Sequence, residues 1–255
     1  MDIHKPKPWH SIREFLKEYV IIVVGVLTAL GAEQVVQAID WQRRVADAER
    51  DMRSELAEDA QHAFGRLTAT DCATAQFKAL RTVLVNNRDA GTPILPMKRY
   101  DFFPITTWLT DTWDNARGLQ LTGHMPTQRL HQYESAFFLA GRLRDLQHEQ
   151  QALGSTVDTL AVNGGRISPA ERDRLFVAVE ALEDTSNQAD NDAERLRESA
   201  QVLGIDLSTA EKQSQVARLH RFKPDCVAAD PDVIETEMKA GLRATNALGI
   251  RHGDP

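Results

Sequence analysis

The stretch EYVIIVVGVLTALGAEQVVQAIDW, residues 18–41, constrains the fold more than any other part of the chain. No charged side chain occurs from Tyr19 to Ala32, and at about 1.5 Å per residue this run covers only about 21 Å of a hydrocarbon layer roughly 30 Å thick. A helix that continues to Trp41 reaches roughly 33 Å and carries an aromatic ring at each end, where membrane helices favour such rings. The stretch therefore predicts a membrane-spanning helix at residues 19–41.

Two other interpretations of this stretch stay open. Small residues at Ala29, Gly31 and Ala32 follow an apolar core and resemble the cleavage region of a signal peptide. Against cleavage, the tail before the core is long and contains Glu14 and Glu18, and the helical pattern continues into WQRRVADAERDMRSEL without a turn signal. The third interpretation is a buried core helix of a soluble protein.

Small residues form a strip on one face of the predicted span. Gly25, Ala29 and Ala32 fall at i, i+4 and i+7, so another helix could approach closely there. Glu33 and Gln37 continue close to this strip, and a partner helix would shield them from lipid. We therefore expect membrane lipid around the span, and either a homo-oligomer or a membrane protein partner on this face.

Composition predicts an all-α fold. The 255 residues are 42% hydrophobic and 26% charged, the balance of a globular protein, and long windows are rich in residues that favour helices. A formal net charge of -7 argues against a nucleic-acid groove, which needs clustered Lys and Arg on one face. We expect the membrane helix to continue into one long helix to about Val85, followed by an antiparallel helical bundle. Along that long helix an apolar stripe has helical or coiled-coil heptad spacing, and it comprises Val45, Met52, Leu56, Ala63 and Leu67.

Turn and capping signals divide the rest of the chain. The segment NNRDAGTPILPMKRYDFFP, residues 86–104, predicts a packed loop, and a helix is expected from Ile105 to Gly118. Thr127 should begin a longer helix with one face made of Leu130, Tyr133, Phe137, Ala140 and Arg144. A capping box of Ser168 and Glu171, with Pro169 between them, predicts a helix that runs to Gly204. A second box at Ser208 and Glu211 and a last helix after Pro231 complete the pattern.

The main domain is predicted to lie outside the cytoplasm. Basic residues do not decide the orientation, because four precede the span and four follow it, namely Lys5, Lys7, Arg13, Lys17, Arg43, Arg44, Arg50 and Arg53. A long hydrophilic domain translocates largely regardless of its charge. Cys72 and Cys226 have no C-x-x-C motif or nearby His partner, which favours a disulfide over a metal or redox site. The alternative is two unrelated buried thiols.

Two sequence blocks resemble uncharacterised bacterial membrane-anchored families that are known as domains of unknown function. The first is FLKEYVIIVVGVLTALGAEQ leading into a charged helix at Trp41, and the second is TWDNARGLQLTGHMPTQRLHQYESAF, with Trp113, Gly118, Leu130 and Tyr133 at the corresponding positions. The resemblance covers about a third of the chain. It implies a cytoplasmic tail at residues 1–18, a single inner-membrane span at 19–41 and a helical periplasmic domain at 42–255. It carries over no catalytic residue.

No motif in the sequence points to a catalytic, cofactor or metal site. Glu55, Glu58, Asp59 and His62 crowd one part of a helix, and the Glu58 to His62 step has a geometry that metal sites use. A second such pair is missing, so we interpret the group as a solvated ridge. A non-enzymatic module for protein interaction or scaffolding in the bacterial envelope is therefore the favoured function. A ligand-sensing helical bundle that acts through a separate signalling protein is the alternative.

Overall fold

The computed structural model describes residues 12–86, 105–162 and 167–222, and all regular structure in these ranges is helical. The order is α1 (Ile12–Asn86), α2 (Asp111–Gly118), the 3-10 helix η1 (Leu121–His124), α3 (Thr127–Val162), α4 (Pro169–Val202) and α5 (Thr209–Phe222). The prediction of an all-α chain with a helical bundle is confirmed. The expected loop at 86–104 and the expected helix after Pro231 lie almost wholly outside the described residues.

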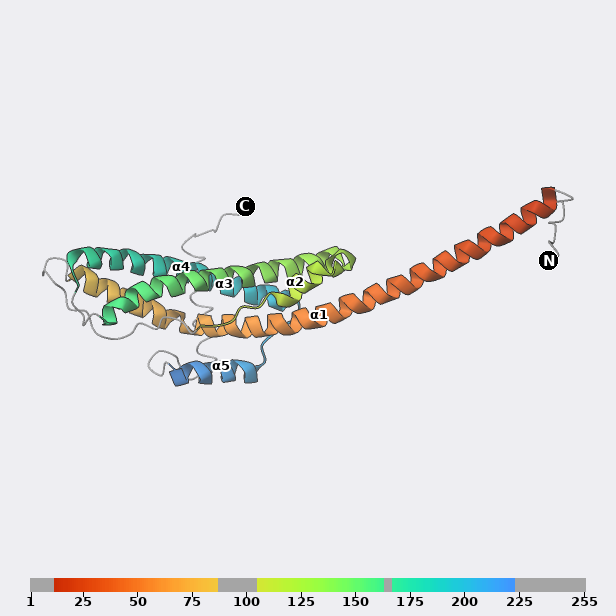
Figure 1. Ribbon diagram of the computed structural model, residues 1–255. Helices are drawn as coiled ribbons and strands as arrows, with labels where there is room; N and C mark the ends of the chain where they lie inside the picture. Colours follow the sequence, from red (N-terminus) through yellow and green to blue (C-terminus); the bar gives the residue numbers. More distant parts are fainter. Residues whose placement is uncertain (1–11, 87–104, 163–166, 223–255) are drawn as a thin grey trace, which may run out of the picture.

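The first helix has 75 residues and is about 110 Å long at 1.5 Å per residue. Its second half lies in the bundle, whereas its first half projects from one end as a single rod (Figure 1). The helix continues without a break through Gly65. The apolar stripe is confirmed as a core face, because Val45, Met52, Leu56 and Ala63 are buried and Leu67 packs against them.

Three long helices form the bundle. Three side chains of α1 show the relative direction of α1 and α4. Going along α1, Arg53 contacts Gly204 just after the end of α4, Arg66 contacts Asp190, and Arg81 contacts Glu180 near the start of α4. Helix α4 is therefore antiparallel to α1, and Figure 1 shows the same relation between α3 and α4. A large apolar cluster fills the half of the bundle nearest the projection, and a second cluster around Phe77 and Val179 fills the distal half.

Local signals fix both ends of α4. The Ser168 side chain accepts a hydrogen bond from the Glu171 backbone, the Glu171 carboxylate accepts one from the Ser168 backbone, and Pro169 is the first helical residue, as predicted. At the other end Gly204 adopts a left-handed φ of 70° and its N–H donates to the Gln201 carbonyl. The N–H of Ile205 donates to Ala200, and the Ile205 side chain is buried, which completes a Schellman motif.

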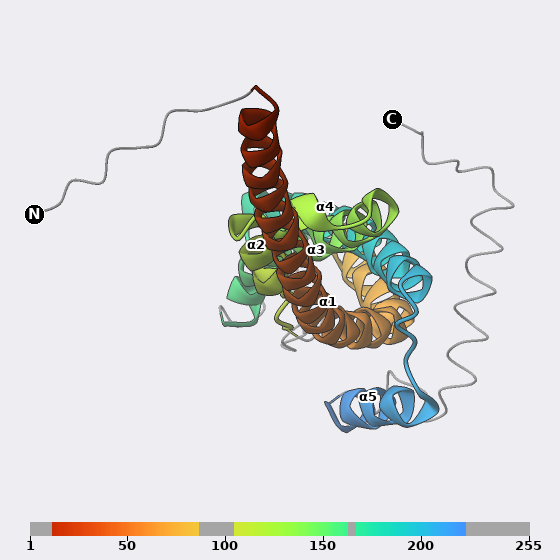
Figure 2. The ribbon, with the colours of Figure 1, turned by 90° about the vertical axis from the view of Figure 1, so that its right-hand side faces the viewer.

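Helix α5 covers a separate face of α1, outside the three-helix core (Figure 2). Its Val216 and Leu219 are buried against Phe64, and Gln61 donates a 3.1 Å hydrogen bond to Glu211. The predicted box at Ser208 and Glu211 is present, with the Ser208 N–H 2.8 Å from the carboxylate.

The helix expected from Ile105 to Gly118 is wrong in its first half. Residues 105–110 lie outside any helix, and α2 begins only at Asp111. The Leu109 N–H donates to the Asp59 carboxylate of α1, and the Thr106 N–H donates to the Gln147 side chain of α3. These side-chain partners replace the hydrogen bonds that a helix would supply, and they let Trp108 enter the core.

Candidate functional site

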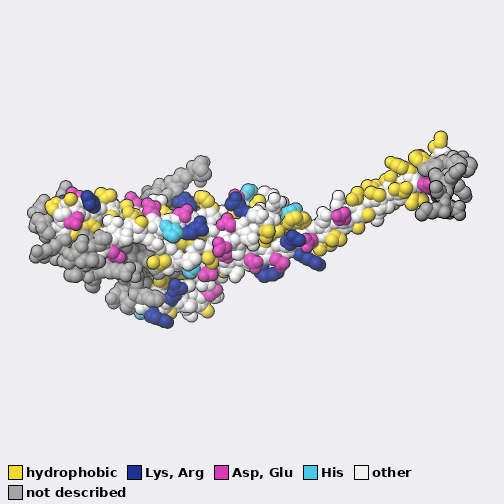
Figure 3. Space-filling view, in the orientation of Figure 1, with side chains coloured by type: hydrophobic (Ala, Val, Ile, Leu, Met, Phe, Trp, Pro, Cys, Tyr) yellow, Lys and Arg dark blue, Asp and Glu magenta, His cyan; other side chains and the backbone are white. Residues whose placement is uncertain are grey.

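The projecting half of α1 is apolar and exposed. An 18-residue window of this helix has a mean hydropathy of 2.0, and none of its residues is buried against the bundle. Ile22 and Val36 are 65% and 66% exposed, and Figure 3 shows apolar side chains along the rod. By length and composition it is a candidate membrane span, the only one in the described part of the chain. The buried-core-helix interpretation is wrong for the isolated chain, because the bundle leaves this surface uncovered.

The predicted packing face lies on this rod. Gly25, Ala29, Ala32 and Glu33 are all exposed, and a Cβ added at Gly25 would meet no atom within 4 Å. Gln37 donates a 3.3 Å hydrogen bond to Glu33, which partly satisfies the carboxylate within the helix. Thr28 donates to the Val24 carbonyl at 2.7 Å, so its hydroxyl is also satisfied locally. With one chain present, association through this face stays a prediction.

An aromatic contact marks the place where the rod joins the bundle. The Trp41 indole stacks on the His124 imidazole of η1, with ring centroids 3.9 Å apart and planes 14° from parallel. Arg44, one turn further along α1, lies over the same indole at 5.6 Å. The corner between α2 and α3 is therefore held beside the end of the predicted span.

The acidic group on α1 binds backbone N–H groups of the segment before α2 and of the first turn of α2. Only part of this acidic group is solvated. Glu58 is exposed, but Asp59 is fully buried and Glu55 is 9% exposed. The Glu55 carboxylate accepts the Thr112 N–H at 3.2 Å, in the first turn of α2, and Asp59 accepts the Leu109 N–H at 3.1 Å. The solvated-ridge interpretation is therefore wrong for Glu55 and Asp59.

Burial changes the protonation of this group. Loss of solvation raises the pKa of Asp59 to about 8, and the nearby Glu55 and Glu58 carboxylates add to the shift. Loss of solvation also lowers the pKa of His62, whose ring meets the Trp108 indole edge-on at 6.0 Å between centroids. No cluster of side chains that could hold a metal ion occurs among the residues that the structure describes.

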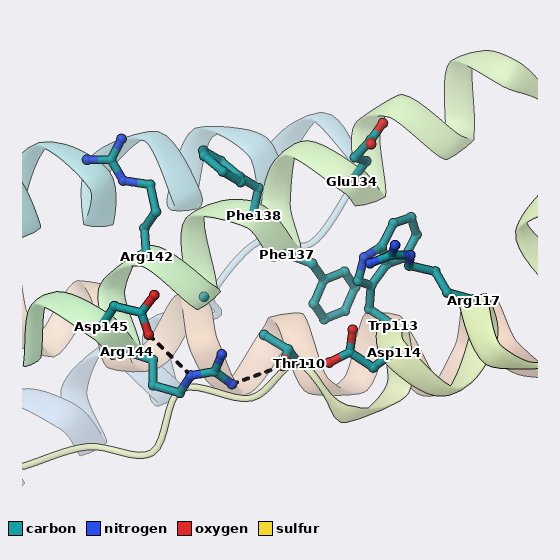
Figure 4. A pocket seen from close by; sticks show the side chains of 11 residues that line it. Thr110, Trp113, Asp114, Arg117, Glu134, Phe137, Phe138, Arg142, Arg144 and Asp145 are labelled. Carbon is teal, nitrogen blue, oxygen red and sulfur yellow. Dashed lines mark hydrogen bonds and ion pairs between the residues drawn. The ribbon is translucent and has the colours of Figure 1, made fainter. Parts of the chain in front are cut away.

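A cavity of about 400 Å³ opens between α2 and α3 on the side of the bundle. Its apolar lining includes Trp113 and Phe137, whose rings stack with centroids 5.7 Å apart, and the 62% exposed Phe138 (Figure 4). Gly141 of α3 leaves room beside these rings, because a Cβ added there would meet nothing within 4 Å. Phe138 supplies the exposed aromatic surface of the cavity, whereas Trp113 and Phe137 are only 8% and 2% exposed.

Charged side chains surround the aromatic lining. Arg144 donates a 3.2 Å hydrogen bond to the Thr110 hydroxyl, which is 3.2 Å from the Asp114 carboxylate. Arg142 pairs at 3.0 Å with Asp192 of α4, whose side chain is 5% exposed. The full set of charged lining residues is Asp114, Arg117, Glu134, Arg142, Arg144 and Asp145. Cations and anions are equal in number, so the cavity favours no charge sign overall. Arg144, expected on the core face of α3, stands at this rim, and Leu143 is buried in its place.

The predicted cysteine bridge extends beyond the described residues. Cys72 lies on α1 and is partly exposed, and the Gln76 side chain donates to its sulfur at 3.7 Å. Cys226 falls in the range 223–255, outside the description. No cysteine pair can therefore be described, and the bridge stays a prediction.

The fold and these sites define a class of protein, a helical bundle with one projecting apolar helix. Comparison with protein-family models, curated proteins and solved structures finds no match to this chain. The resemblance to bacterial membrane-anchored families therefore rests on the two sequence blocks alone.

Proposed function

We propose that this chain is a membrane-anchored helical module that binds a protein partner, or a second copy of itself, in the bacterial envelope. The observation that carries the proposal is the exposed apolar half of α1, which has no partner surface in its own bundle. Exposure of this apolar surface to water would cost about 25 cal/mol of free energy for each Å². A bilayer removes that cost.

An uncleaved anchor fits the continuity of α1 better than a cleaved signal peptide. The helix passes through the small residues at Ala29 and Ala32 and on into the core, so cleavage there would leave a frayed, polar helix start at Glu33. On this proposal the anchor lies in the inner membrane and the bundle lies in the periplasm, with residues 1–18 in the cytoplasm.

Fractionation tests the anchor. The full-length chain should stay in the membrane pellet after a carbonate wash, which strips peripheral proteins. A mature soluble form that starts near Glu33 would contradict the anchor and support a signal peptide. A membrane-impermeant thiol reagent applied after reduction should label Cys72 only once the outer membrane is opened, and labelling that needs disrupted inner membranes would place the bundle in the cytoplasm.

The cavity between α2 and α3 favours a second candidate, a ligand-sensing bundle. Its volume of about 400 Å³ falls within the range of small-molecule sites, and its stacked aromatic rings suit a flat or apolar ligand. On this alternative, the bundle would act through a separate signalling protein.

Purification from detergent-solubilised membranes separates the two candidates. A stoichiometric protein partner supports the first, and a co-purified small molecule supports the second. Gly141→Leu should fill the cavity and lose such a small molecule, whereas Gly154→Leu, also on α3 and also with open space, should keep it. Retention in both variants would mean that the molecule binds elsewhere.

A further inference from the structure

The corner between α2 and α3 lies at the same level as the end of the predicted span. Helix α2 ends at Gly118, Gln120 turns the chain with a φ of 60°, and η1 brings His124 onto the Trp41 ring. Because the stacked rings are only 3.9 Å apart, the part of the corner that carries His124 lies next to Trp41, whereas Leu119 lies further along α1, beside Ala48 and Asp51. Trp41 is also the residue expected in the headgroup layer.

This corner has no formal charge. The sequence GLQLTGHMPTQ, residues 118–128, holds no Asp, Glu, Lys or Arg, although 26% of the whole chain is charged and about three such residues would be expected. The opposite end of the bundle differs, since α4 starts there with Glu171, Arg172, Asp173 and Arg174. At the end beside the span, the charged side chains come from the flanking helices, such as Arg117 of α2 and Arg43 and Arg44 of α1, and not from this corner.

The outward side of the corner is apolar or neutral. Leu121 and Met125 point into the bundle and are buried, whereas Leu119 is 58% exposed and Gly123 and Pro126 are exposed beside it. Leu119 lines a groove with Ala48 and Asp51 of α1 and keeps more than half of its surface exposed. Single exposed leucines are common on soluble proteins, so Leu119 counts here because it stands in an uncharged turn near the end of the predicted span.

Arginines border the same surface. Arg43 and Arg44 are exposed and lie two and three residues beyond Trp41, which is within about 5 Å along the helix, but Arg44 is paired with Asp40 at 2.8 Å. Arg117 is exposed at the end of α2, directly before the uncharged segment. Guanidinium groups at this depth suit phosphate oxygens, to which they can donate in pairs.

We infer that the corner of residues 118–128 rests on the phospholipid headgroups, with Leu119 facing the interfacial layer and the exposed Arg43 and Arg117 meeting phosphates. The inference depends on the proposed span, because the span puts Trp41 at the membrane surface. It adds that the bundle stands on the bilayer with one defined end down, and is held there by the Trp41–His124 contact.

Photocrosslinking of the full chain in phospholipid vesicles tests the inference. A benzophenone amino acid is placed at one of three exposed positions, and lipid adducts are detected by mass spectrometry. The positions are Leu119 at the corner, Leu27 in the span and Val177 on α4, which are 58%, 62% and 67% exposed. Val177 is the distal control, because nearby Glu180 pairs with Arg81, roughly 60 Å along α1 from Trp41.

Adducts at positions 27 and 119 but not at 177 are the expected result. Adducts at 27 alone would overturn the headgroup contact and leave the proposed anchor intact. Absence of adducts at 27 would overturn the anchor, and the inference with it. Adducts at all three positions would show that the bundle lies flat on the bilayer, which contradicts an end-down placement.

Discussion

Arg66 of α1 and Asp190 of α4 form an ion pair with a 2.7 Å contact inside the bundle, where their side chains are only 9% and 14% exposed. Arg66 also donates to Gln150 of α3 at 3.2 Å and to the Ser186 carbonyl at 3.2 Å. Loss of solvation lowers the pKa of Arg66 and raises that of Asp190, and their mutual attraction opposes both changes. One buried guanidinium thus joins all three long helices.

Removing only the cation of this pair should be costly. Arg66→Met leaves the Asp190 carboxylate buried with a single hydroxyl donor, that of Thr70, and should lower the free energy of unfolding by about 3 to 5 kcal/mol. Urea unfolding followed by circular dichroism measures the loss. The double variant Arg66→Met with Asp190→Leu should recover much of it, because no charge is then left buried. A double variant no more stable than Arg66→Met would show that the unpaired Asp190 carboxylate is not the cause of the loss, and a double variant less stable than the parent would show that the pair provides net stability.

Asp59 should make the stability depend on pH. With a folded-state pKa of about 8 against an ordinary 3.8, the folded chain keeps a proton that the unfolded chain has released between these values. The folded state should therefore lose stability as the pH rises from about 4 to about 8. Asp59→Asn mimics the neutral acid. The free energy of unfolding of this variant, relative to that of the parent, should therefore increase as the pH rises from about 4 to about 8 and stay constant at higher pH.

The comparison with the parent chain isolates this effect. His62, whose pKa is lowered from 6.5, opposes it at lower pH, but it is present in both chains and cancels in the difference. Asp51→Asn, at an exposed position on the same helix, serves as a control and should show a difference that does not vary with pH in this way. A constant difference for Asp59→Asn would mean that Asp59 is ionised in the folded state.

Replacing Gly204 and Gly141 by alanine should change the free energy of unfolding in opposite directions. Gly204 has a φ of 70°, so Gly204→Ala should lower the free energy of unfolding by about 1 to 2 kcal/mol even though the nearest atom to the added Cβ is 3.9 Å away. Gly141 lies inside α3 in open space, so Gly141→Ala should raise it by about 1 kcal/mol. Thermal unfolding of both variants checks the pair. Equal effects would contradict the assigned backbone conformations.

The small-residue face of α1 should mediate self-association. Gly25→Leu and Ala29→Leu add bulk where a second helix is expected and should abolish crosslinking of the full chain in membranes. Val24→Leu changes size on another face and should crosslink like the parent. If all three variants crosslink equally, the chain does not associate through this strip.

A Cys72–Cys226 bridge should be detectable by gel electrophoresis. Closing a loop of about 150 residues would stabilise the chain by roughly 4 to 5 kcal/mol in the chain-entropy model. The oxidised chain should therefore run faster than the reduced chain on a non-reducing gel, and Cys72→Ser should remove the difference. Identical mobilities with two free thiols would exclude the bridge.

Sequence patterns predicted the parts of the fold that depend on local interactions. The capping box at Ser168 and the stripe from Val45 to Ala63 involve residues close in sequence, and both are confirmed. Burial of Asp59 was not predictable, because the group that covers it, the Leu109 N–H, is 50 residues away. The same reason applies to the cavity, whose stacked rings come from Trp113 of α2 and Phe137 of α3. The exposed apolar rod was predicted because its run of uncharged residues is continuous.

The unbroken helix between the predicted span and the core fixes how the bundle is rotated about the α1 axis relative to the span. Each residue advances an α-helix by about 100°, and no turn or glycine lies between Trp41 and Met52 to absorb a change. The number of residues there thus determines which flank of the bundle faces a neighbouring protein in the same membrane. A single alanine inserted after Arg44 would rotate the bundle relative to the span by about 100°, which is more than a quarter of a turn. The contacts that α1 makes inside the bundle after the insertion would be preserved.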